Sequence, residues 1–465
     1  MVASLVTAMV LTRALQPEAF GILGFGTAIL SYLGLAVVLG TDTIGVRDVA
    51  RAPDDTTIVK DIVGMRLAIA GLAMTALVVA VPMLPQTETV KTVLLIQGCG
   101  LFITAVTVDY YFQGVQRMGI IALRQVVAAL ASVLAVLALV RSPADVFIAA
   151  AIPVAAVGLG ALLLLAVFLS QTRTLPFRLA PRTWPVVAKR AMPLAIAAIM
   201  VTVYYNIDIV MLGFMADPTS LGWYTASARV LTLGFIAGEM LRAAFLPRLA
   251  RMRDDPTAEP GTLNAFALSV LFIGFAVAAI GITQAGPIIR ILFGESYLGG
   301  TRALAILMAA VAVYHVVIVY GSPLVAWDRD KAFAGISAFG AVANIGLNLY
   351  LIPRYGIEGA ATATLMSQSM VALVLAYTFH RMSGMTFLSI VLRLLVAGAV
   401  GGAALVYGNS LAGPLGGIGD AVARLGMAAA VFGTIYIGIG YLSGVVKPAE
   451  IKGLIRMVRK PAGDA

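Results

Sequence analysis

Four charged side chains lie deep within long apolar stretches of this sequence, and they are the residues most able to do chemistry. Asp208 lies in one such stretch, and Arg229, Glu239 and Arg242 lie in the next, 221–246. A charge at the centre of a helix in a lipid bilayer costs about 2.5–3.5 kcal/mol, so such side chains face a cavity or a partner. An arginine in a cavity can bind phosphate oxygens, and a carboxylate there can take up a proton or a cation.

Asp208 follows two polar residues, Tyr205 and Asn206, that could donate hydrogen bonds to a bound group or to the carboxylate. Two interpretations have equal weight. In the first, Asp208 faces a cavity and binds a proton or cation during a transport cycle. In the second, it pairs with an arginine and holds two parts of the protein together.

The charges of the stretch 221–246 differ in what their spacing predicts. Glu239 and Arg242 are three residues apart, so they can pair on one face of a helix, and an internal ion pair is the favoured interpretation. Arg229 has no such local partner in the sequence. We expect it to be a cavity cation that binds a diphosphate or an acidic sugar, because a planar guanidinium suits phosphate oxygens.

Three further arginines stand at the ends of apolar stretches. Arg13 closes the first stretch, and we expect it at the outer mouth of a cavity, with anchoring to lipid headgroups as the alternative. Arg66 and Arg124 fall in the first turns of two later stretches. For both we favour snorkelling of the side chain to the cytoplasmic interface; a role at an inner gate is the alternative.

Asp109 stands next to Tyr110 and Tyr111 at the end of an apolar stretch. This grouping, together with Gln113, is typical of an interfacial aromatic belt, which is the favoured interpretation. The alternative is contact with sugars, because aromatic faces and amides suit glycans. His315 lies within another apolar stretch, where an interior histidine with satisfied hydrogen bonds is favoured over a proton relay.

The composition places the protein in a membrane. Of its 465 residues 61% are hydrophobic and 12% are charged, against about 25% charged in a soluble domain. The single cysteine, Cys99, excludes an internal disulfide, and with two histidines we expect no metal site. No Walker A motif occurs, and we expect no cofactor. The net charge of +10 is better explained by cytoplasmic loops than by nucleic acid as a partner.

Apolar runs of about 20 residues, the length that spans a bilayer, recur along the whole chain. We expect them to be helices, since backbone polar groups in hydrocarbon must be paired internally. The first run has only about 15 apolar residues, so we expect a truncated start. The predicted spans lie near 1–15, 20–40, 62–84, 92–112, 118–140, 145–169, 190–213, 221–246, 263–284, 302–325, 332–352, 357–379, 389–408 and 423–443.

The basic residues predict the orientation of these fourteen spans. If the N-terminus is cytoplasmic, few of the 32 lysines and arginines fall on the outer side. This bias predicts that both termini are cytoplasmic. The outer basic residues would be Arg13, Lys91, Arg141, Arg290, Arg302, Arg354 and Arg424.

The two halves of the chain resemble each other. The run QPEAFG at 16–21 corresponds to DPTSLG at 217–222, and VARAPDD at 49–55 corresponds to LARMRDD at 249–255. Six spans separate the copies, so both have the same orientation. This predicts a parallel repeat about an axis along the membrane normal, with the proline-rich basic linker 171–189 between the halves.

Several motifs together resemble the polysaccharide-export flippases of the multidrug/oligosaccharidyl-lipid/polysaccharide exporter superfamily. RALQPEAFG at 13–21 is similar to that family's R-x-L-G-P-E-x-[YF]-G signature, with Gln16 in place of the glycine. VRDVAR at 46–51 and YYFQGVQR at 110–117 resemble two of its loops, and NIGLNLYLIPRYGIEGAA at 344–361 resembles a late block.

The resemblance implies an all-α polytopic membrane protein of about 14 transmembrane helices, with two six-helix lobes around a central cavity and two C-terminal helices. It also implies that the protein is no enzyme. Such proteins move polyprenyl-diphosphate-linked oligosaccharides from the cytoplasmic to the outer leaflet of the bacterial inner membrane. The corresponding ranges are an N-lobe at 1–170, a linker at 171–189, a C-lobe at 190–380, two helices at 381–445 and a basic cytoplasmic tail at 446–465.

The implied partners are the lipid-linked glycan and membrane lipids, with a functional link to glycosyltransferases and a polysaccharide polymerase. Two alternatives share the fold: a lipid II flippase and a cation-coupled multidrug antiporter. A membrane-embedded glycosyltransferase would need acidic catalytic residues in a large outer loop, and the predicted outer loops are short.

Overall fold

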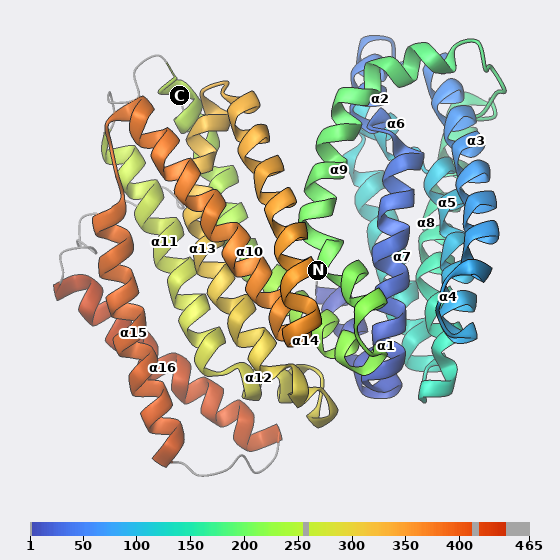
Figure 1. Cartoon of the computed structure of the whole chain (residues 1–465). Helices are drawn as coiled ribbons and strands as arrows, with labels where there is room; N and C mark the ends of the chain where they lie inside the picture. Colours follow the sequence, from blue (N-terminus) through green and yellow to red (C-terminus); the bar gives the residue numbers. More distant parts are fainter. Residues whose placement is uncertain (1, 254–259, 412–417, 443–465) are drawn as a thin grey trace. The chain divides into compact units, whose positions relative to one another are not determined.

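The computed structural model describes residues 2–253, 260–411 and 418–442, and these residues form helices without a single β-strand (Figure 1). The predicted basic tail, 446–465, lies outside this range. Eleven helical stretches are long and apolar enough to span a membrane. The protein is therefore a multi-pass α-helical membrane protein, as predicted.

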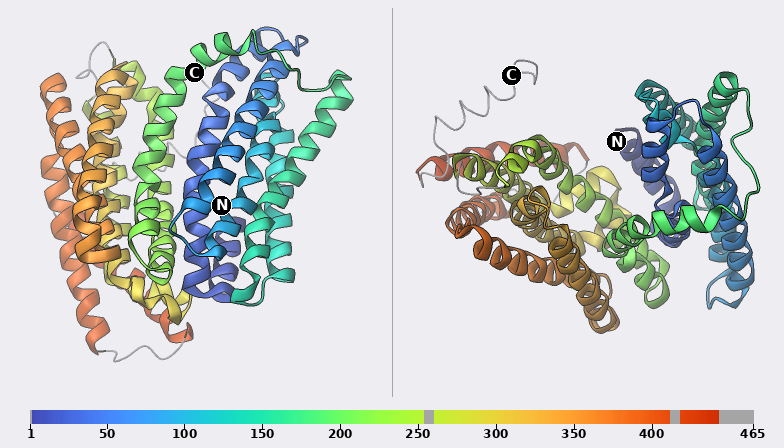
Figure 2. Two further views of the ribbon diagram at one scale, coloured as in Figure 1. Left: turned by 45° about the vertical axis from the view of Figure 1, so that its right-hand side comes forward. Right: turned by 90° about the horizontal axis from the view of Figure 1, so that it is seen from above.

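The chain folds into two compact units, Met1–Thr225 and Ala226–Ala465. Within each unit the long helices run roughly parallel or antiparallel to one another (Figure 2). The helices of the first unit are α1 (Val2–Val38), α2 (Thr41–Arg51), α3 (Thr57–Ala80), α4 (Glu88–Gly98), α5 (Gly100–Val106), α6 (Asp109–Gly114), α7 (Met118–Leu139), α8 (Val146–Thr172) and α9 (Trp184–Met215).

The next helix, α10 (Pro218–Arg251), begins in the first unit and continues into the second. The remaining helices are α11 (Pro260–Thr283), α12 (Ala285–Leu292), α13 (Thr301–Ala326), α14 (Asp330–Ser383), α15 (Leu388–Leu411) and α16 (Ile418–Leu442). Short 3₁₀ helices lie at Val81–Met83, Pro143–Asp145 and Glu295–Gly300. The two compact units divide between Thr225 and Ala226, whereas the predicted lobes of the repeat are separated by the linker 171–189. The lobe boundaries therefore stay a prediction.

Two of the long helices are bent where the sequence separates two spans. In α1, Gln16 has φ 61° and ψ 171° directly before Pro17. In α14, Gly356 has φ 54° and ψ −130°, three residues after Pro353. With α1 and α14 counted as two helices each, and the 32-residue helix α9 added, the described residues contain the fourteen crossings that the hydropathy pattern predicts.

The repeat is visible as a reciprocal contact within the first unit. A Cβ atom added to Gly222 would lie 1.9 Å from the carbonyl oxygen of Pro17, and one added to Gly21 would lie 2.2 Å from that of Pro218. These are corresponding positions of the two copies. Each copy therefore places its glycine on the proline carbonyl of the other, as a two-fold repeat requires. The approach is so close that only glycine fits.

The predicted linker is attached to the first unit. Arg178 donates two hydrogen bonds to Asp61 of α3, one of them from Nη2 to Oδ2 at 2.9 Å. The Arg178 backbone also donates to the Lys60 carbonyl, and its own carbonyl lies against Gly64. The hydrogen bond to Asp61 raises the pKa of Arg178. The linker is therefore fixed to the start of α3.

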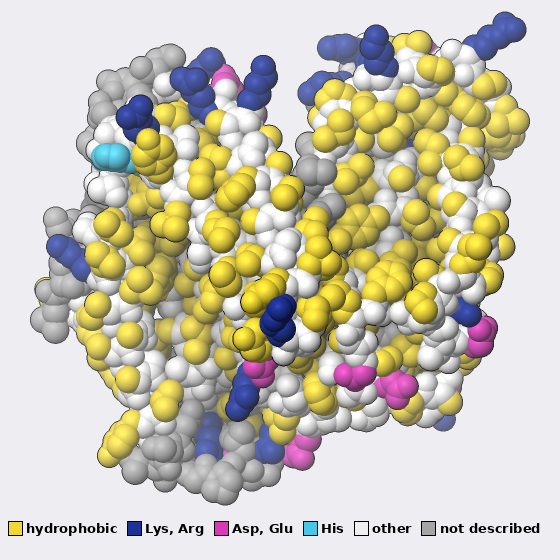
Figure 3. All heavy atoms as spheres, in the orientation of Figure 1, with side chains coloured by type: hydrophobic (Ala, Val, Ile, Leu, Met, Phe, Trp, Pro, Cys, Tyr) yellow, Lys and Arg dark blue, Asp and Glu magenta, His cyan; other side chains and the backbone are white. Residues whose placement is uncertain are grey.

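The surface has the distribution that a bilayer favours. On the face drawn in Figure 3, hydrophobic side chains cover most of the middle, and lysine and arginine side chains gather at one end of each unit. Large apolar side chains such as Leu72, Leu134 and Leu373 are 72%, 64% and 72% exposed. Lipid chains can cover such side chains without the cost that water would impose.

Candidate functional site

One face of α10 is exposed and carries charge at membrane depth. Arg229, Thr232 and Glu239 are three and seven residues apart, which places them on one side of a helix. Arg229 and Thr232 are exposed, and the Glu239 side chain is 37% exposed. We call this surface the α10 polar face.

The opposite side of α10 packs tightly on α13. Gly234 and Gly238, four residues apart, allow close approach of the two helices, as in small-xxx-small pairs of membrane helices. A Cβ atom on Gly234 would meet Val311 at 2.8 Å, and one on Gly238 would meet His315 at 2.7 Å. The glycines therefore fix which side of α10 is buried, and this leaves the polar face exposed.

Glu239 and Arg242 form the predicted ion pair. The Arg242 guanidinium lies 2.6 Å from Glu239 Oε2, and both side chains are more than a third exposed. The hydroxyl of Tyr314, on α13, donates to Glu239 Oε1 at 2.7 Å. Tyr314 in turn stacks on Phe235, with ring centroids 3.9 Å apart. The Glu239 carboxylate is therefore held from two sides, by Arg242 of its own helix and by Tyr314 of α13.

Arg229 lies nearer the start of α10, on the same polar face, and interacts electrostatically with Tyr297. Its exposure agrees with the expectation of a cavity cation but does not test it. Arg13 is also exposed, in the last turn before the bend at Gln16, whose side-chain amide donates to the Arg13 carbonyl at 3.1 Å. Its role stays a prediction.

Asp208 is buried, with 5% of its surface exposed, and accepts a hydrogen bond of 2.8 Å from the hydroxyl of Tyr224. Both interpretations of this carboxylate stay open, since a buried acid can be a proton site or a structural anchor. Asn206 donates to the Thr202 carbonyl at 3.5 Å. The side chain of Tyr205 lies outside the described residues.

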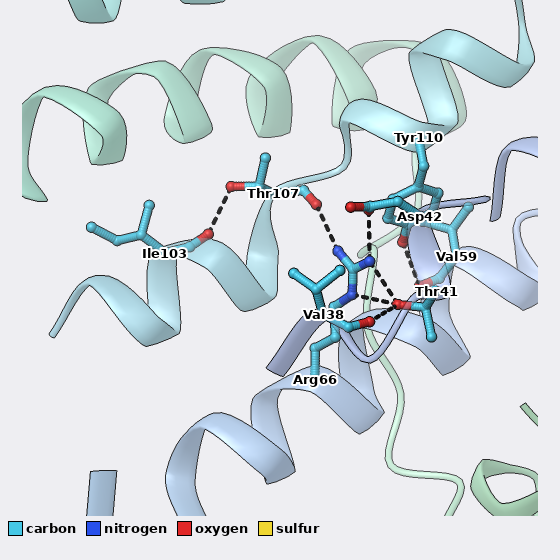
Figure 4. A network of polar contacts seen from close by, with 8 residues as sticks. All are labelled: Val38, Thr41, Asp42, Val59, Arg66, Ile103, Thr107 and Tyr110. Atoms are coloured by element: carbon cyan, nitrogen blue, oxygen red, sulfur yellow. Dashed lines mark hydrogen bonds and ion pairs between the residues drawn. The ribbon is translucent and has the colours of Figure 1, made fainter. Parts of the chain in front are cut away.

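Arg66 is the centre of a buried network in the first unit (Figure 4). Its Nε and Nη2 atoms donate to the Thr41 hydroxyl at 2.8 and 2.6 Å, and Nη2 also donates to Asp42 at 2.7 Å. A fourth hydrogen bond runs from Nη1 to the Thr107 carbonyl at 3.5 Å, and the Tyr110 ring centroid lies 5.1 Å from the guanidinium. The Arg66 residue is 1% exposed, so the predicted snorkelling is wrong: polar groups inside the protein hold the charge.

Arg124 forms a second ion pair beside this network. Its guanidinium lies 2.8 Å from Asp109, and the side chain is 13% exposed, so it too points into the protein instead of to the interface. A Cβ atom on Gly160 of α8 would lie 2.9 Å from the stem of Arg124. The predicted snorkelling is thus wrong for Arg124 as well, because α8 leaves room for an arginine beside it.

The aromatic residues after Asp109 are part of the core. Tyr110 and Phe112 are fully buried and Tyr111 is 6% exposed, with its ring 4.8 Å from that of Phe168. The prediction of an interfacial belt is therefore wrong. The helix is interrupted just before them at Thr107 and Val108, and this break turns the carbonyl of Thr107 towards Arg66.

His315 is fully buried in α13, as predicted for an interior histidine, and its Nδ1 lies 2.8 Å from the Val311 carbonyl. The expectation that its hydrogen bonds are satisfied holds for one ring nitrogen only. The other, Nε2, has no hydrogen-bond partner among the residues that the structure describes. Within the same residues no cluster of His, Cys, Asp and Glu is arranged to hold a metal ion.

Four residues whose side chains form hydrogen bonds in these networks were not predicted: Thr41, Asp42, Tyr224 and Tyr314. Asp42 and Thr41 begin α2, an amphipathic helix in what the hydropathy pattern treats as a loop. Tyr314 stands midway along α13, beside His315, and its position in an apolar stretch is the one sequence signal that could have drawn attention to it.

Comparison with known proteins identifies the family. The family model described as "Polysaccharide biosynthesis protein" matches residues 1–253, more than half of the chain. The chain belongs to this family. The resemblance of the sequence motifs to polysaccharide-export flippases is thereby confirmed.

Three curated relatives illustrate the similarity. A Shigella flexneri protein named as an O-antigen transporter is 29% identical over 184 residues, which cover 39% of this chain and 43% of that protein. The capsular polysaccharide biosynthesis protein CapF of Staphylococcus aureus is 25% identical over 191 residues, covering 41% and 48%. The chain thus spans less than half the length of these two relatives. A Shigella dysenteriae protein, also named as an O-antigen transporter, is 22% identical over 78% of this chain and 92% of its own length.

Solved structures show the same fold. The lipid II flippase MurJ in an inward closed conformation has a TM-score of 0.73 at 12% identity, covering 94% of this chain and 96% of MurJ. An inward-facing multidrug transporter of the MATE family has a TM-score of 0.67 at 15% identity, covering 82% and 94%. At these identities the likeness concerns the fold alone.

Proposed function

We propose that this protein is a flippase that moves a polyprenyl-diphosphate-linked oligosaccharide from the cytoplasmic to the outer leaflet by alternating access. The family and the names of its relatives support this proposal. In this role the protein would carry out no covalent chemistry. It would act in the bacterial inner membrane with both termini in the cytoplasm, between the glycosyltransferases that build the glycan and a polymerase that consumes it.

The α10 polar face is the observation that carries the proposal. A helix that spans the bilayer and exposes Arg229, Glu239 and Arg242 cannot present that side to lipid chains without a cost of several kcal/mol. The face must therefore line a wet path. Arg229 supplies a fork of donors that matches diphosphate oxygens, and hydroxyl and carboxylate groups along the same face can bind sugar hydroxyls.

The membrane potential can assist such a movement. A diphosphate headgroup is anionic, and it moves away from a cytoplasm that is electrically negative. Each unit of negative charge then contributes about 2.3 kcal/mol per 100 mV in the favourable direction. Asp208, buried and hydrogen-bonded to Tyr224, is our candidate for coupling to a proton or cation. Flipping that is unchanged in Asp208→Asn and insensitive to both gradients would remove it from that role.

A reconstituted flipping assay tests the proposal. Proteoliposomes are loaded with polyprenyl-diphosphate-oligosaccharide carrying a fluorescent sugar, and a membrane-impermeant reductant quenches the label in the outer leaflet. We expect the protein to make nearly all of the label accessible, whereas liposomes without protein leave about half protected. Movement of lipid II in preference to longer glycans, or of small lipophilic cations alone, would contradict the proposal and favour a lipid II flippase or a drug antiporter.

A further inference from the structure

The imidazole of His315 occupies a slot that two other helices leave open for it. A Cβ atom on Gly274 of α11 would lie 2.1 Å from His315 Cγ, and one on Gly238 of α10 would lie 2.7 Å from Nε2. Any larger residue at either position would collide with the ring. The slot lies near the middle of α13 and hence near the middle of the bilayer.

The hydrogen bond of Nδ1 defines the state of the ring. The Val311 carbonyl can only accept, so Nδ1 carries a hydrogen atom. In the neutral imidazole Nε2 is then a bare acceptor. It is buried and has no donor among the described residues, and such an orphaned group costs about 1–3 kcal/mol. A proton on Nε2 would remove this cost only if the new N–H group could donate a hydrogen bond to a nearby acceptor.

Glu239 is the group that can be this acceptor. It follows Gly238, where an added Cβ atom would lie 2.7 Å from Nε2, and it interacts electrostatically with His315. No residue of α11 in the stretch 260–283 titrates. On α13 the neighbouring group is Tyr314, and on α10 it is Arg242, and both hold the Glu239 carboxylate. The charged residues of α14 lie at its ends and near its bend.

We propose that His315 is a proton-binding site of the second unit and that Glu239 delivers its proton. Glu239 is 37% exposed on the polar face, where it can be protonated by water. Its O–H bond then breaks as the Nε2–H bond forms, which leaves an imidazolium beside a carboxylate. The imidazolium competes with Tyr314 and Arg242 for that carboxylate, so protonation loosens contacts that join α10 to α13.

The site links a proton to the α10 polar face. If the protein is the flippase proposed above, this link couples outward movement of the glycan to a proton, and this part of the inference rests on that function. The binding of the proton itself does not rest on it. The slot, the orphaned nitrogen and the exposed acid are present whatever the protein transports.

Nuclear magnetic resonance can observe the site directly, because the chain has only two histidines, His315 and His380. The full protein, labelled with ¹⁵N-histidine in lipid nanodiscs, is titrated with acid, and His380→Asn assigns the two sets of signals. We expect His315 Nε2 to change from a bare to a protonated nitrogen. In Glu239→Gln its midpoint should fall by about one pH unit or more, a tenfold loss of proton affinity.

The matched control is Glu295→Gln, which removes an acid of the same unit that pairs with Arg290 instead. It should leave the His315 midpoint in place. A His315 signal that stays in one state throughout, or that responds equally to both variants, would overturn the proposal and leave the histidine as a packing residue. This readout needs no transport, so its failure differs from failure of the flippase assignment.

A transport assay is the second test of proton binding at His315. His315→Asn replaces the imidazole by a polar side-chain amide that has no titrating nitrogen. In proteoliposomes that flip the glycan, a pH gradient should accelerate the wild-type protein and leave His315→Asn at its gradient-independent rate. Equal acceleration of the two proteins would contradict proton binding at His315 as the coupling step.

Discussion

The two units treat membrane arginines in opposite ways. In the first unit Arg66 and Arg124 point inward, and each is paired with an aspartate beside a break in the α5–α6 helix. In the second unit Arg229 is exposed on the α10 polar face, and Arg242, which pairs with Glu239 of that face, has a side chain 38% exposed. The first arrangement joins helices to one another, whereas the second leaves charge on the surface of α10, where we propose that it meets the substrate. An arginine in a transmembrane stretch is therefore not by itself a substrate residue; its exposure decides.

The largest expected effect is on transport by the exposed arginine. Arg229→Ala removes a charge-assisted donor from the bound diphosphate, worth roughly 1.5–3 kcal/mol, so we expect flipping to fall about tenfold or more. The melting temperature in detergent should hardly change, and Arg229→Lys should recover part of the rate. If Arg229→Ala instead unfolds at a much lower temperature but flips normally per folded molecule, Arg229 has a structural role like that of Arg66 and Arg124.

Arg66 should show the reverse pattern. Arg66→Ala removes the hydrogen bonds to Thr41 and Asp42 and opens a cavity, so we expect stability to fall by roughly 2–3 kcal/mol. Thermal unfolding of the purified protein measures this change. Arg47→Ala, which truncates an exposed arginine of α2, is the control and should unfold like the wild type. If Arg66→Ala and Arg47→Ala unfold at the same temperature, the buried network of Arg66 does not stabilise the fold.

The reciprocal contact of the repeat should tolerate no added methyl group. Gly222→Ala places a Cβ atom 1.9 Å from the Pro17 carbonyl oxygen, so the helices must separate. Overpacking of this kind costs about 1–3 kcal/mol. Gly34→Ala in α1, where a Cβ atom meets nothing within 4 Å, is the matched control. Equal melting temperatures for the two variants would contradict the contact.

The smallest expected effect concerns the exposed ion pair. Arg242→Gln breaks the pair with Glu239, but in a wet path such a pair contributes only about 0.2–1 kcal/mol. The melting temperature should therefore change little. A destabilisation of several kcal/mol would mean that the polar face of α10 meets lipid or a dry interface, because an unpaired charge is expensive there.

Much of the fold was accessible from the sequence. The bends at Gln16 and Gly356 fall between predicted spans, because a proline one residue after Gln16 and another three residues before Gly356 interrupt the helices. The repeat was recognisable from two short motifs, and the Glu239–Arg242 pair from a spacing of three residues. All of these are local patterns, which a helix converts directly into geometry.

What the sequence concealed depends on contacts between distant segments. Arg66 and Asp42 are 24 residues apart, and no pattern indicates that α2 returns to α3. Tyr110 and Phe112 stand at the end of a predicted span, where aromatic residues face either headgroups or the core, and only packing decides between these. The orphaned Nε2 of His315 likewise depends on two glycines from other helices.

The most direct test of the account asks whether the α10 polar face is wet and is covered by substrate. In a Cys99→Ser background, which removes the only native cysteine, Thr232→Cys is exposed to a membrane-impermeant maleimide, with the lipid-exposed Leu373→Cys as reference. We predict fast labelling at position 232, slowed by polyprenyl-diphosphate-linked glycan, and almost none at 373. Labelling at 232 as slow as at 373, or unaffected by the glycan, would contradict the account.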